Sequence, residues 1–299
     1  MVYLRNFQLR SADSEQGFFM DFLRTCYDSY YPFQFFPQIK ELSEVEFADI
    51  TIFCGSNGSG KSTLLNIIAE KVGLKRETPF NKTDFFDPYI QGCSYDLDVN
   101  NREKIRDLMN VSRIITSDDV FKHIMSVRER NENISFKRGL IFEEKSHINR
   151  YGAQGPRGFN LDDPESIKAY KDYSQMIRQS ASKYIRNKAV IDERTYSNGE
   201  NGFRYFTDAI QPGGLYLLDE PENSLSAEMQ LELVQYIQGM AWHYDCQFIL
   251  STHSPFILSI PYARIYNMDE TPVRTCKWTE LPNVRLFYDF FKGHSSDFE

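Results

Sequence analysis

The sequence has little that points outside the cytoplasm. Its five cysteines are scattered, include no C-x-x-C pair and are odd in number, so they indicate neither a disulfide framework nor a zinc site. No stretch approaches the roughly 18 uninterrupted apolar residues that a membrane helix needs. The first residues, Met1–Arg5, lack the charged-then-apolar layout of a signal peptide. We therefore expect a cytoplasmic protein with no membrane segment of its own.

Internal repeats, coiled-coil heptads and low-complexity tracts are also absent. The 299 residues are 41% hydrophobic, which is enough for a sizeable core, and they carry a net charge of −8. This charge is uneven, because residues 101–200 hold 19 lysines and arginines against 15 acids. A basic segment in an acidic chain indicates either a docking surface for nucleic acid or protein, or a solvated helical surface without a partner.

Two regions, 1–75 and 196–299, alternate strand patterns with helical patterns. The strand patterns lie at Val2–Leu9, Ile50–Phe53, Gly214–Leu218, Cys246–Leu250 and Ala263–Asn267, and the helical ones at Ser62–Val72 and Ala227–Trp242. Such alternation is typical of a mostly parallel sheet with crossover helices. It predicts an α/β fold whose core is built from both regions.

Residues 76–195 interrupt this core, and we expect them to form an inserted, largely helical subdomain. A short strand pattern, Arg113–Thr116, lies within them. The clearest helix starts at Asp163 and Pro164, an N-cap followed by proline at the first helical position. The basic helix from Pro164 to Lys188 is our candidate docking surface.

A phosphate-binding loop follows the strand Ile50–Phe53. The pattern G-x-x-x-x-G-K-[ST] is matched by Gly55, Ser56, Asn57, Gly58, Ser59, Gly60, Lys61 and Ser62, with Thr63 next. The glycines let backbone N–H groups approach phosphates, and the positive end of the following helix faces the same anion. We expect Lys61 to reach the β- and γ-phosphates of ATP and Ser62 to bind Mg²⁺. This motif, with a strand before it and a helix after it, predicts a P-loop NTPase.

Two carboxylates end a second hydrophobic strand, Gly214–Leu218. Ligands gather at the carboxyl ends of strands in open α/β sheets, so Asp219 is the expected acid on the Mg²⁺ side, acting directly or through water. Glu220 is the candidate to position or deprotonate the attacking water. The alternative for both acids is a simple acidic turn before Pro221.

A histidine follows the next strand, Cys246–Leu250, in the segment Ser251-Thr252-His253-Ser254. Neighbouring strands of a parallel sheet end at the same edge, so His253 is placed to sense the γ-phosphate. A structural role is the alternative for an isolated histidine. The other four histidines have no comparable setting.

The order of these motifs resembles the ABC ATPase series of Walker A, signature, Walker B, D-loop and switch histidine. The signature would be Tyr196-Ser197-Asn198-Gly199-Glu200, and the D-loop Asn223-Ser224-Leu225-Ser226. More narrowly, LLDEPENSLS and STHSPF resemble stand-alone bacterial ABC-type ATPases often labelled "AAA family". These are similar to the ATPase parts of SMC proteins and of overcoming-lysogenization-defect nucleases. The resemblance covers nearly the whole chain and is weakest over 76–195.

The resemblance implies an ABC-type core and a head-to-tail homodimer that sandwiches two ATP molecules. Ser197 and Gly199 of one subunit would face the γ-phosphate held by the other subunit's P-loop. Asn198 stands where the signature usually has glycine, and it tolerates positive φ better than most residues. Ser226 stands where the D-loop usually has aspartate. A plain turn is the alternative for Ser197–Gly199.

The family's Q-loop glutamine has no counterpart in this sequence. The strand Arg113–Thr116 runs into Ser117-Asp118-Asp119, and we expect Asp118 to take the metal- and water-sensing position. A helix N-cap is the other role open to it. Tyr3, Arg5 and the cluster Tyr30–Phe33 are candidates to line the adenine, although core packing is the commoner role of aromatic residues.

Together the residues and the resemblance imply an ATPase in which Lys61, Glu220 and His253 are catalytic. The ATP-bound dimer would switch an effector protein or a nucleic-acid-linked process, such as phage defence or a toxin-linked response. The alternative is the ATP-binding subunit of an ABC membrane transporter. The altered signature, the missing glutamine and the roughly 135 residues between Lys61 and the signature argue against it.

Two further functions fit less well. An SMC-type DNA-repair ATPase needs long coiled-coil arms, for which the insert has neither the length nor the heptads. Glu220 and His253 argue against a scaffold that binds nucleotide without hydrolysing it. The remaining acids suggest no second metal centre, so we expect any cutting of nucleic acid to be done by a partner.

Overall fold

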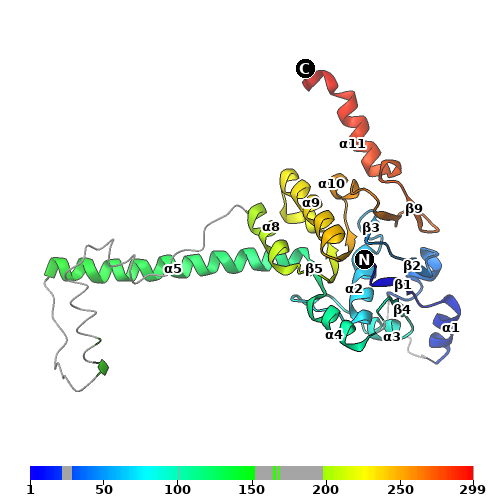
Figure 1. Ribbon diagram of the computed structural model, residues 1–299, viewed down its shortest axis with the longest axis horizontal. Helices are drawn as coiled ribbons and strands as arrows, with labels where there is room; N and C mark the ends of the chain where they lie inside the picture. The colour runs from blue at the N-terminus through cyan, green and yellow to red at the C-terminus, as the bar shows by residue number, and fades with distance from the viewer. Residues whose placement is uncertain (22–28, 100, 152–163, 166–167, 169–197, 299) are drawn as a thin grey trace. The chain divides into compact units, whose positions relative to one another are not determined.

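The computed structural model divides the chain into two compact units (Figure 1). One unit comprises Met1–Phe121 and Asn198–Glu299, and the other comprises Lys122–Ser197. The residues described are 1–21, 29–99, 101–151, 164–165, 168 and 198–298. Residues 76–121, which we expected in the insertion, therefore belong to the first unit. The reason is that β5 (Arg113–Thr116) pairs with the main sheet.

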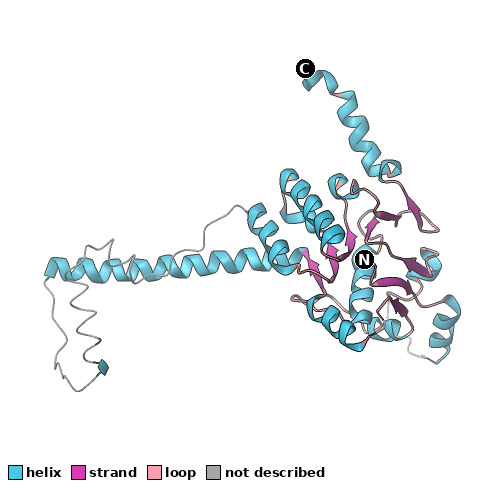
Figure 2. Cartoon of the chain, in the orientation of Figure 1, coloured by secondary structure: helices cyan, strands magenta, loops and turns pink. Residues whose placement is uncertain are grey.

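The main sheet has six strands in the order β5-β6-β7-β3-β8-β9, shown in magenta in Figure 2. Their bounds are β3 Ile50–Cys54, β6 Leu215–Asp219, β7 Gln247–Ser251, β8 Arg264–Asn267 and β9 Arg274–Cys276. The first five strands in spatial order are parallel, and β9 pairs antiparallel with β8. The mostly parallel α/β sheet expected from the alternating pattern is confirmed.

A second, three-stranded antiparallel sheet has the order β2-β1-β4. Its strands are β1 Leu4–Gln8, β2 Glu44–Glu46 and β4 Ser94–Leu97. The fully buried side chain of Gln247 joins the two sheets. Its Oε1 accepts from the backbone N–H groups of Tyr3 and Leu4 at 2.9 and 2.8 Å, and its Nε2 donates to the carbonyls of Leu4 and Ala48.

Helices surround both sheets of the first unit. The helices of this unit are α1 Ala12–Asp21, α2 Lys61–Val72, α3 Phe86–Gln91, α4 Arg102–Val111, α8 Asn198–Ala209, α9 Ala227–His243, α10 Pro255–Leu258 and α11 Pro282–Gly293. Shorter turns are η1 Phe35–Ile39, η2 Pro221–Ser224, η3 Trp278–Glu280 and η4 Ser295–Phe298. The long helix α5, Ser117–Tyr151, begins in the first unit and contributes its remaining residues to the second.

The core of the first unit follows the strand pleat. Successive residues of a strand point to opposite faces, so Leu215, Leu217 and Ile249 join one cluster, together with Leu64 and Ile67 of α2. Helix α2 contacts β6 and β7 on this face. Helix α9 also contacts β7, but its buried side chains are not part of that cluster, so the two helices cover opposite faces.

Within the second unit the structure describes the helical residues of α5 from Lys122 onward and three positions beyond it. The predicted basic helix Pro164–Lys188 lies almost entirely outside the described residues. No helix in the described ranges combines the length and the apolar character required to span a bilayer.

Candidate nucleotide-binding site

The carboxyl ends of β3, β6 and β7 meet at one edge of the main sheet, and a cavity of about 380 Å³ lies beside them. It is lined by Tyr31, Asn57, Gly58, Gly60, Lys61, Ser62, Thr63 and Glu220. Residues that stand far apart in the sequence, from the P-loop and from the end of β6, thus share one cavity. The remaining P-loop residues Gly55, Ser56 and Ser59 complete the turn behind it.

Backbone shape explains the glycines at two positions of the loop. Gly58 and Gly60 have φ values of +80° and +96°, a region that favours glycine over other residues. A Cβ at Gly60 would also lie 2.4 Å from the Phe35 ring. Helix α2 begins at Lys61, directly after this turn, so its free N–H groups face the cavity. The cradle is shaped for an anion.

An aspartate that follows another strand is bonded to the P-loop. The backbone N–H of Ser56 donates to both carboxylate oxygens of Asp269, at 2.8 and 2.9 Å, and its hydroxyl donates to one of them at 2.7 Å. Asp269 follows β8, far from the P-loop in the sequence. No local sequence pattern links the two positions, so this contact was not predicted.

Lys61 is buried and bonded to its own loop. Its ammonium donates to the carbonyls of Gly55 at 2.8 Å and Ser56 at 3.1 Å. Burial lowers the pKa of Lys61, and the nearby carboxylate of Glu220 acts in the opposite direction. A phosphate chain placed in the cradle would give this desolvated cation a charged partner in place of two neutral ones.

Asp219 accepts hydrogen bonds from two hydroxyl groups. Its Oδ1 accepts from Ser62 at 2.9 Å and also from Ser251 at the end of β7. Burial raises the pKa of this carboxyl, and the two hydrogen bonds partly offset the effect. A hydroxyl and a carboxylate beside a phosphate cradle fit Mg²⁺, which takes one or two protein oxygens together with phosphate oxygens. Ser62 and Asp219 are the residues that would hold the ion.

Glu220 occupies a left-handed backbone conformation, with φ of +48°, at the turn after β6. Its backbone N–H donates to the Ser251 carbonyl at 3.0 Å, and its Oε2 accepts from Asn223 at 2.9 Å. The other carboxylate oxygen lies 3.6 Å from Nε2 of His253. That nitrogen is buried and has no hydrogen-bond partner. The turn therefore presents Glu220 to the cavity with His253 beside it.

A second acid, Glu222, ties the histidine loop to this turn. Its Oε1 accepts from the backbone N–H of His253 at 2.6 Å, while its Oε2 is buried without a partner. Burial raises the pKa of Glu222. No role was predicted for Glu222, because its partner lies 31 residues away in the sequence. Its place two residues after the Walker B acid Glu220 was the one local indication.

Three other expected residues remain, in the signature and at the start of α5. Ser197 lies outside the described residues, and Gly199 lies in the first turn of α8, with the backbone of Ser224 and Ser226 nearby. Asp118 is exposed at the start of α5, whereas the neighbouring Asp119 is buried and caps this helix start through Thr116. The site role of Asp118 thus stays a prediction.

Of the aromatic residues suggested for adenine, Tyr31 lines the cavity, and its hydroxyl donates to Thr63 at 2.5 Å. Phe33 is buried in the core, and Tyr3 lies by a different cavity. Tyr31 is thus the member of the set that faces the P-loop.

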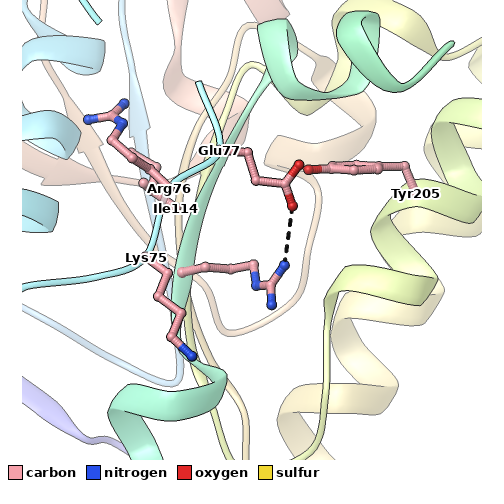
Figure 3. A pocket seen from close by; sticks show the side chains of 6 residues that line it. Lys75, Arg76, Glu77, Ile114 and Tyr205 are labelled. Atoms are coloured by element: carbon pink, nitrogen blue, oxygen red, sulfur yellow. Dashed lines mark ion pairs between the residues drawn. The ribbon is translucent and has the colours of Figure 1, made fainter. Parts of the chain in front are cut away.

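A smaller cavity of about 280 Å³ lies away from this site, beside the edge strand β5 (Figure 3). Glu77 points toward Tyr205 there and forms a long ion pair with Arg113, at 3.6 Å. Burial raises the pKa of Tyr205, and the Glu77 carboxylate adds to the effect. Two of the three cations that line this cavity are paired with acids, Arg113 with Glu77 and Arg76 with Glu70.

A P-loop and an acid-ended strand share one cavity, and a histidine loop lies beside the acid at its edge. These elements define the class as a P-loop ATPase fold of ABC type. The family model described as "AAA domain, putative AbiEii toxin, Type IV TA system" matches residues 86–259, more than half of the chain. The chain belongs to this family.

Solved structures match along most of the chain at low identity, and no curated protein matches it. The Smc head domain bound to the C-terminal domain of ScpA, from Pyrococcus furiosus, is 14% identical with a TM-score of 0.42, over 97% of this chain and 100% of that one. A nucleotide-free ATP-binding cassette from an ABC transporter is 14% identical with a TM-score of 0.44, over 96% and 99%.

Proposed function

We propose that this protein hydrolyses ATP in a Mg²⁺-dependent reaction and uses the nucleotide cycle as a switch. Lys61 and the P-loop N–H groups bind the phosphates. Glu220 positions a water molecule and accepts its proton as the water oxygen attacks the γ-phosphorus. The bond from this phosphorus to the bridging oxygen breaks, and ADP and inorganic phosphate leave. Bound Mg²⁺ would neutralise charge on the phosphates.

The observation that carries this proposal is the hydrogen bond of 2.9 Å between Ser62 and Asp219. It joins the first turn of α2 to the end of β6 across the intervening strand β7. A metal-binding hydroxyl and a carboxylate thus lie together beside the cavity that Lys61 and Glu220 line. A phosphate-binding loop without hydrolysis would not need this acidic arrangement or the adjacent histidine.

The finer proposals rest on the family resemblance. We propose a head-to-tail homodimer in the ATP-bound state, in which Ser197 and Gly199 complete the partner's site. The family description names a toxin–antitoxin system, which supports a toxin-linked or defence role with an effector protein. The basic segment Pro164–Lys188 is the proposed contact for nucleic acid, and we propose that the protein acts in the cytoplasm.

Mixing two inactive variants tests the shared site. Lys61→Ala removes the phosphate ligand, and Gly199→Val alters the signature at a position where a Cβ meets only ordinary contacts. Each variant alone should hydrolyse little ATP, and the mixture should recover activity, because a mixed dimer has one complete site. No recovery, with both variants folded and the wild type active, would refute the shared site.

The same assay, with duplex and single-stranded DNA and RNA added, tests the nucleic-acid link. Stimulation that weakens with salt would support a contact through the basic segment. An unchanged rate would favour a protein effector instead.

A further inference from the structure

Helix α11 leaves a large apolar surface uncovered. Five of its side chains, Leu286, Phe287, Tyr288, Phe290 and Phe291, are between 47% and 72% exposed. The helix extends away from the sheets toward the C-terminus (Figure 1). Soluble proteins seldom expose so many clustered aromatic residues unless the surface has a partner. We therefore expect another macromolecular surface to cover these side chains.

A groove lies beside this helix. Its volume is about 610 Å³, and its walls come from α11, η3 and α10, through Val284, Phe291, Trp278, Pro255 and Phe256. Its polar end is formed by Glu222 and His253 of the site described above. The groove is thus apolar along its length and ends next to the hydrolysis centre.

The two apolar faces of α11 differ in their surroundings. At 100° per residue, Val284, Phe287 and Phe291 share the face that lines the groove. Leu286 and Phe290, four residues apart, share an adjacent face that is not part of the groove wall. The first face is one wall of a receptor site, and the second is a ridge of suitable chemistry to fill such a site.

We propose that two copies of this chain pair through α11, each placing the Leu286–Phe290 ridge of its helix in the groove of the other. A two-fold arrangement of this kind uses the same patch on both subunits. The pairing does not need nucleotide and is separate from the ATP-bound dimer proposed above. It places a helix of the second copy close to His253 of the first.

The area supports a second copy as the occupant. A fully exposed aromatic residue offers roughly 200 Å², so the five exposed side chains offer roughly 550 Å² on each subunit. A standard interface takes about 800 Å² from each partner, and the groove walls on α10 and η3 supply further area.

The charges of α11 lie on a third face of the helix. Arg285, Asp289 and Lys292 form a stripe at spacings of four and three residues, which at 100° per residue points away from both the ridge and the groove face. The ridge that enters the groove of the other copy is therefore apolar.

The experiment is the mass of the full-length protein in solution without nucleotide, by sedimentation or light scattering over a range of concentrations. We expect a dimer for the wild type and a monomer for the double variant Leu286→Asp with Phe290→Asp. Both side chains are exposed, so these changes leave the core intact. Met20→Asp on α1, where Met20 is 80% exposed, is the matched control and should remain a dimer.

Fluorescence gives an independent readout, because the chain has two tryptophans and one of them, Trp278, lines the groove. In a Trp242→Phe background, dilution through the dimer dissociation constant should shift the emission to longer wavelength, and the double variant should show the shifted spectrum at all concentrations. A nucleotide-free wild type that stays monomeric, or a double variant that stays dimeric, would overturn the proposal. Neither result bears on hydrolysis, which is measured separately.

Discussion

The side chains of the nucleotide cradle and of helix α11 are satisfied in opposite ways. In the cradle, Lys61, Ser62 and Asp219 are hydrogen-bonded within the chain. On α11, large apolar side chains remain exposed. The cradle exchanges internal bonds for those of a small charged ligand, whereas α11 gains free energy only when another macromolecular surface covers it. The first is a preformed site, and the second is an interface.

The two acids at the end of β6 show the same contrast on a smaller scale. Asp219 is tied to two hydroxyls, while Glu220 follows it in a left-handed turn and faces the cavity. Consecutive residues point to opposite sides of a strand, and the turn brings the second acid back toward the ligand. One acid is therefore suited to an ion and the other to water.

The largest effect is expected from the cradle. Lys61→Ala removes the cation that faces the phosphates, and we expect ATP hydrolysis to fall by about 10²–10³. Nucleotide binding, followed by fluorescence of an ATP analogue, should weaken as well. Lys71→Ala, a lysine later on the same helix, is the control and should hydrolyse as the wild type does. ATP hydrolysis by Lys61→Ala at the wild-type rate would mean that this loop does not bind the phosphates of the hydrolysed ATP.

The junction of the two sheets should give the next largest effect. Gln247→Ala leaves two buried backbone N–H groups without acceptors, and we expect the free energy of unfolding to fall by about 3 kcal/mol. Denaturant titration measures this change. Gln91→Ala, at the exposed end of α3, is the control. A loss below about 1 kcal/mol would mean that the Gln247 side chain does not hold the sheets together.

A smaller effect on rate is expected from Glu222. Glu222→Ala removes the acceptor for the His253 N–H, so we expect kcat to fall about tenfold with little change in KM. Glu222→Gln keeps an acceptor oxygen and should lie close to the wild type. If both variants lose activity equally, the acid acts through its charge and not through this hydrogen bond, and if neither loses activity, Glu222 has no part in the rate.

The smallest effect concerns stability and pH. Burial raises the pKa of Asp219, so the fold disfavours the ionised carboxylate. The protonated side chain is tolerated in acid, and the free energy of unfolding falls as pH rises from the unfolded-state pKa through the raised folded-state pKa. Asp219→Asn should therefore be more stable than the wild type at neutral pH without Mg²⁺, by about 1 kcal/mol. The difference should disappear in acid, and Mg²⁺ should stabilise the wild type alone. Thermal unfolding across pH checks both.

The cradle was predictable from the sequence because its chemistry is local. Gly55 to Thr63 are consecutive residues that form one loop and the first turn of α2. The strands before each motif are short apolar runs that cannot be exposed. The P-loop fold and the shared cavity of Lys61, Ser62 and Glu220 followed from those runs, since parallel strands end at one edge.

The contacts that support the cradle were not predictable in this way. Asp269, Glu222 and Gln247 act on partners 31 to 244 residues away, and each looks like an ordinary polar residue in its own segment. The boundary of the insertion was placed wrongly for the same reason, since Arg113–Thr116 joins the main sheet only through pairing with β6. The exposed aromatic surface of helix α11 was not predicted either, because a pattern of apolar residues does not tell whether the same chain or a second copy covers them.

The most direct test of the central claim compares the wild type with Glu220→Gln at saturating Mg²⁺ and ATP, measuring bound nucleotide and released phosphate on the same samples. We predict equal binding and a fall in phosphate release of at least about 10²-fold, because the variant keeps the shape of the site and loses the base. Phosphate release by Glu220→Gln at the wild-type rate, or a wild type that binds no ATP, would contradict the account.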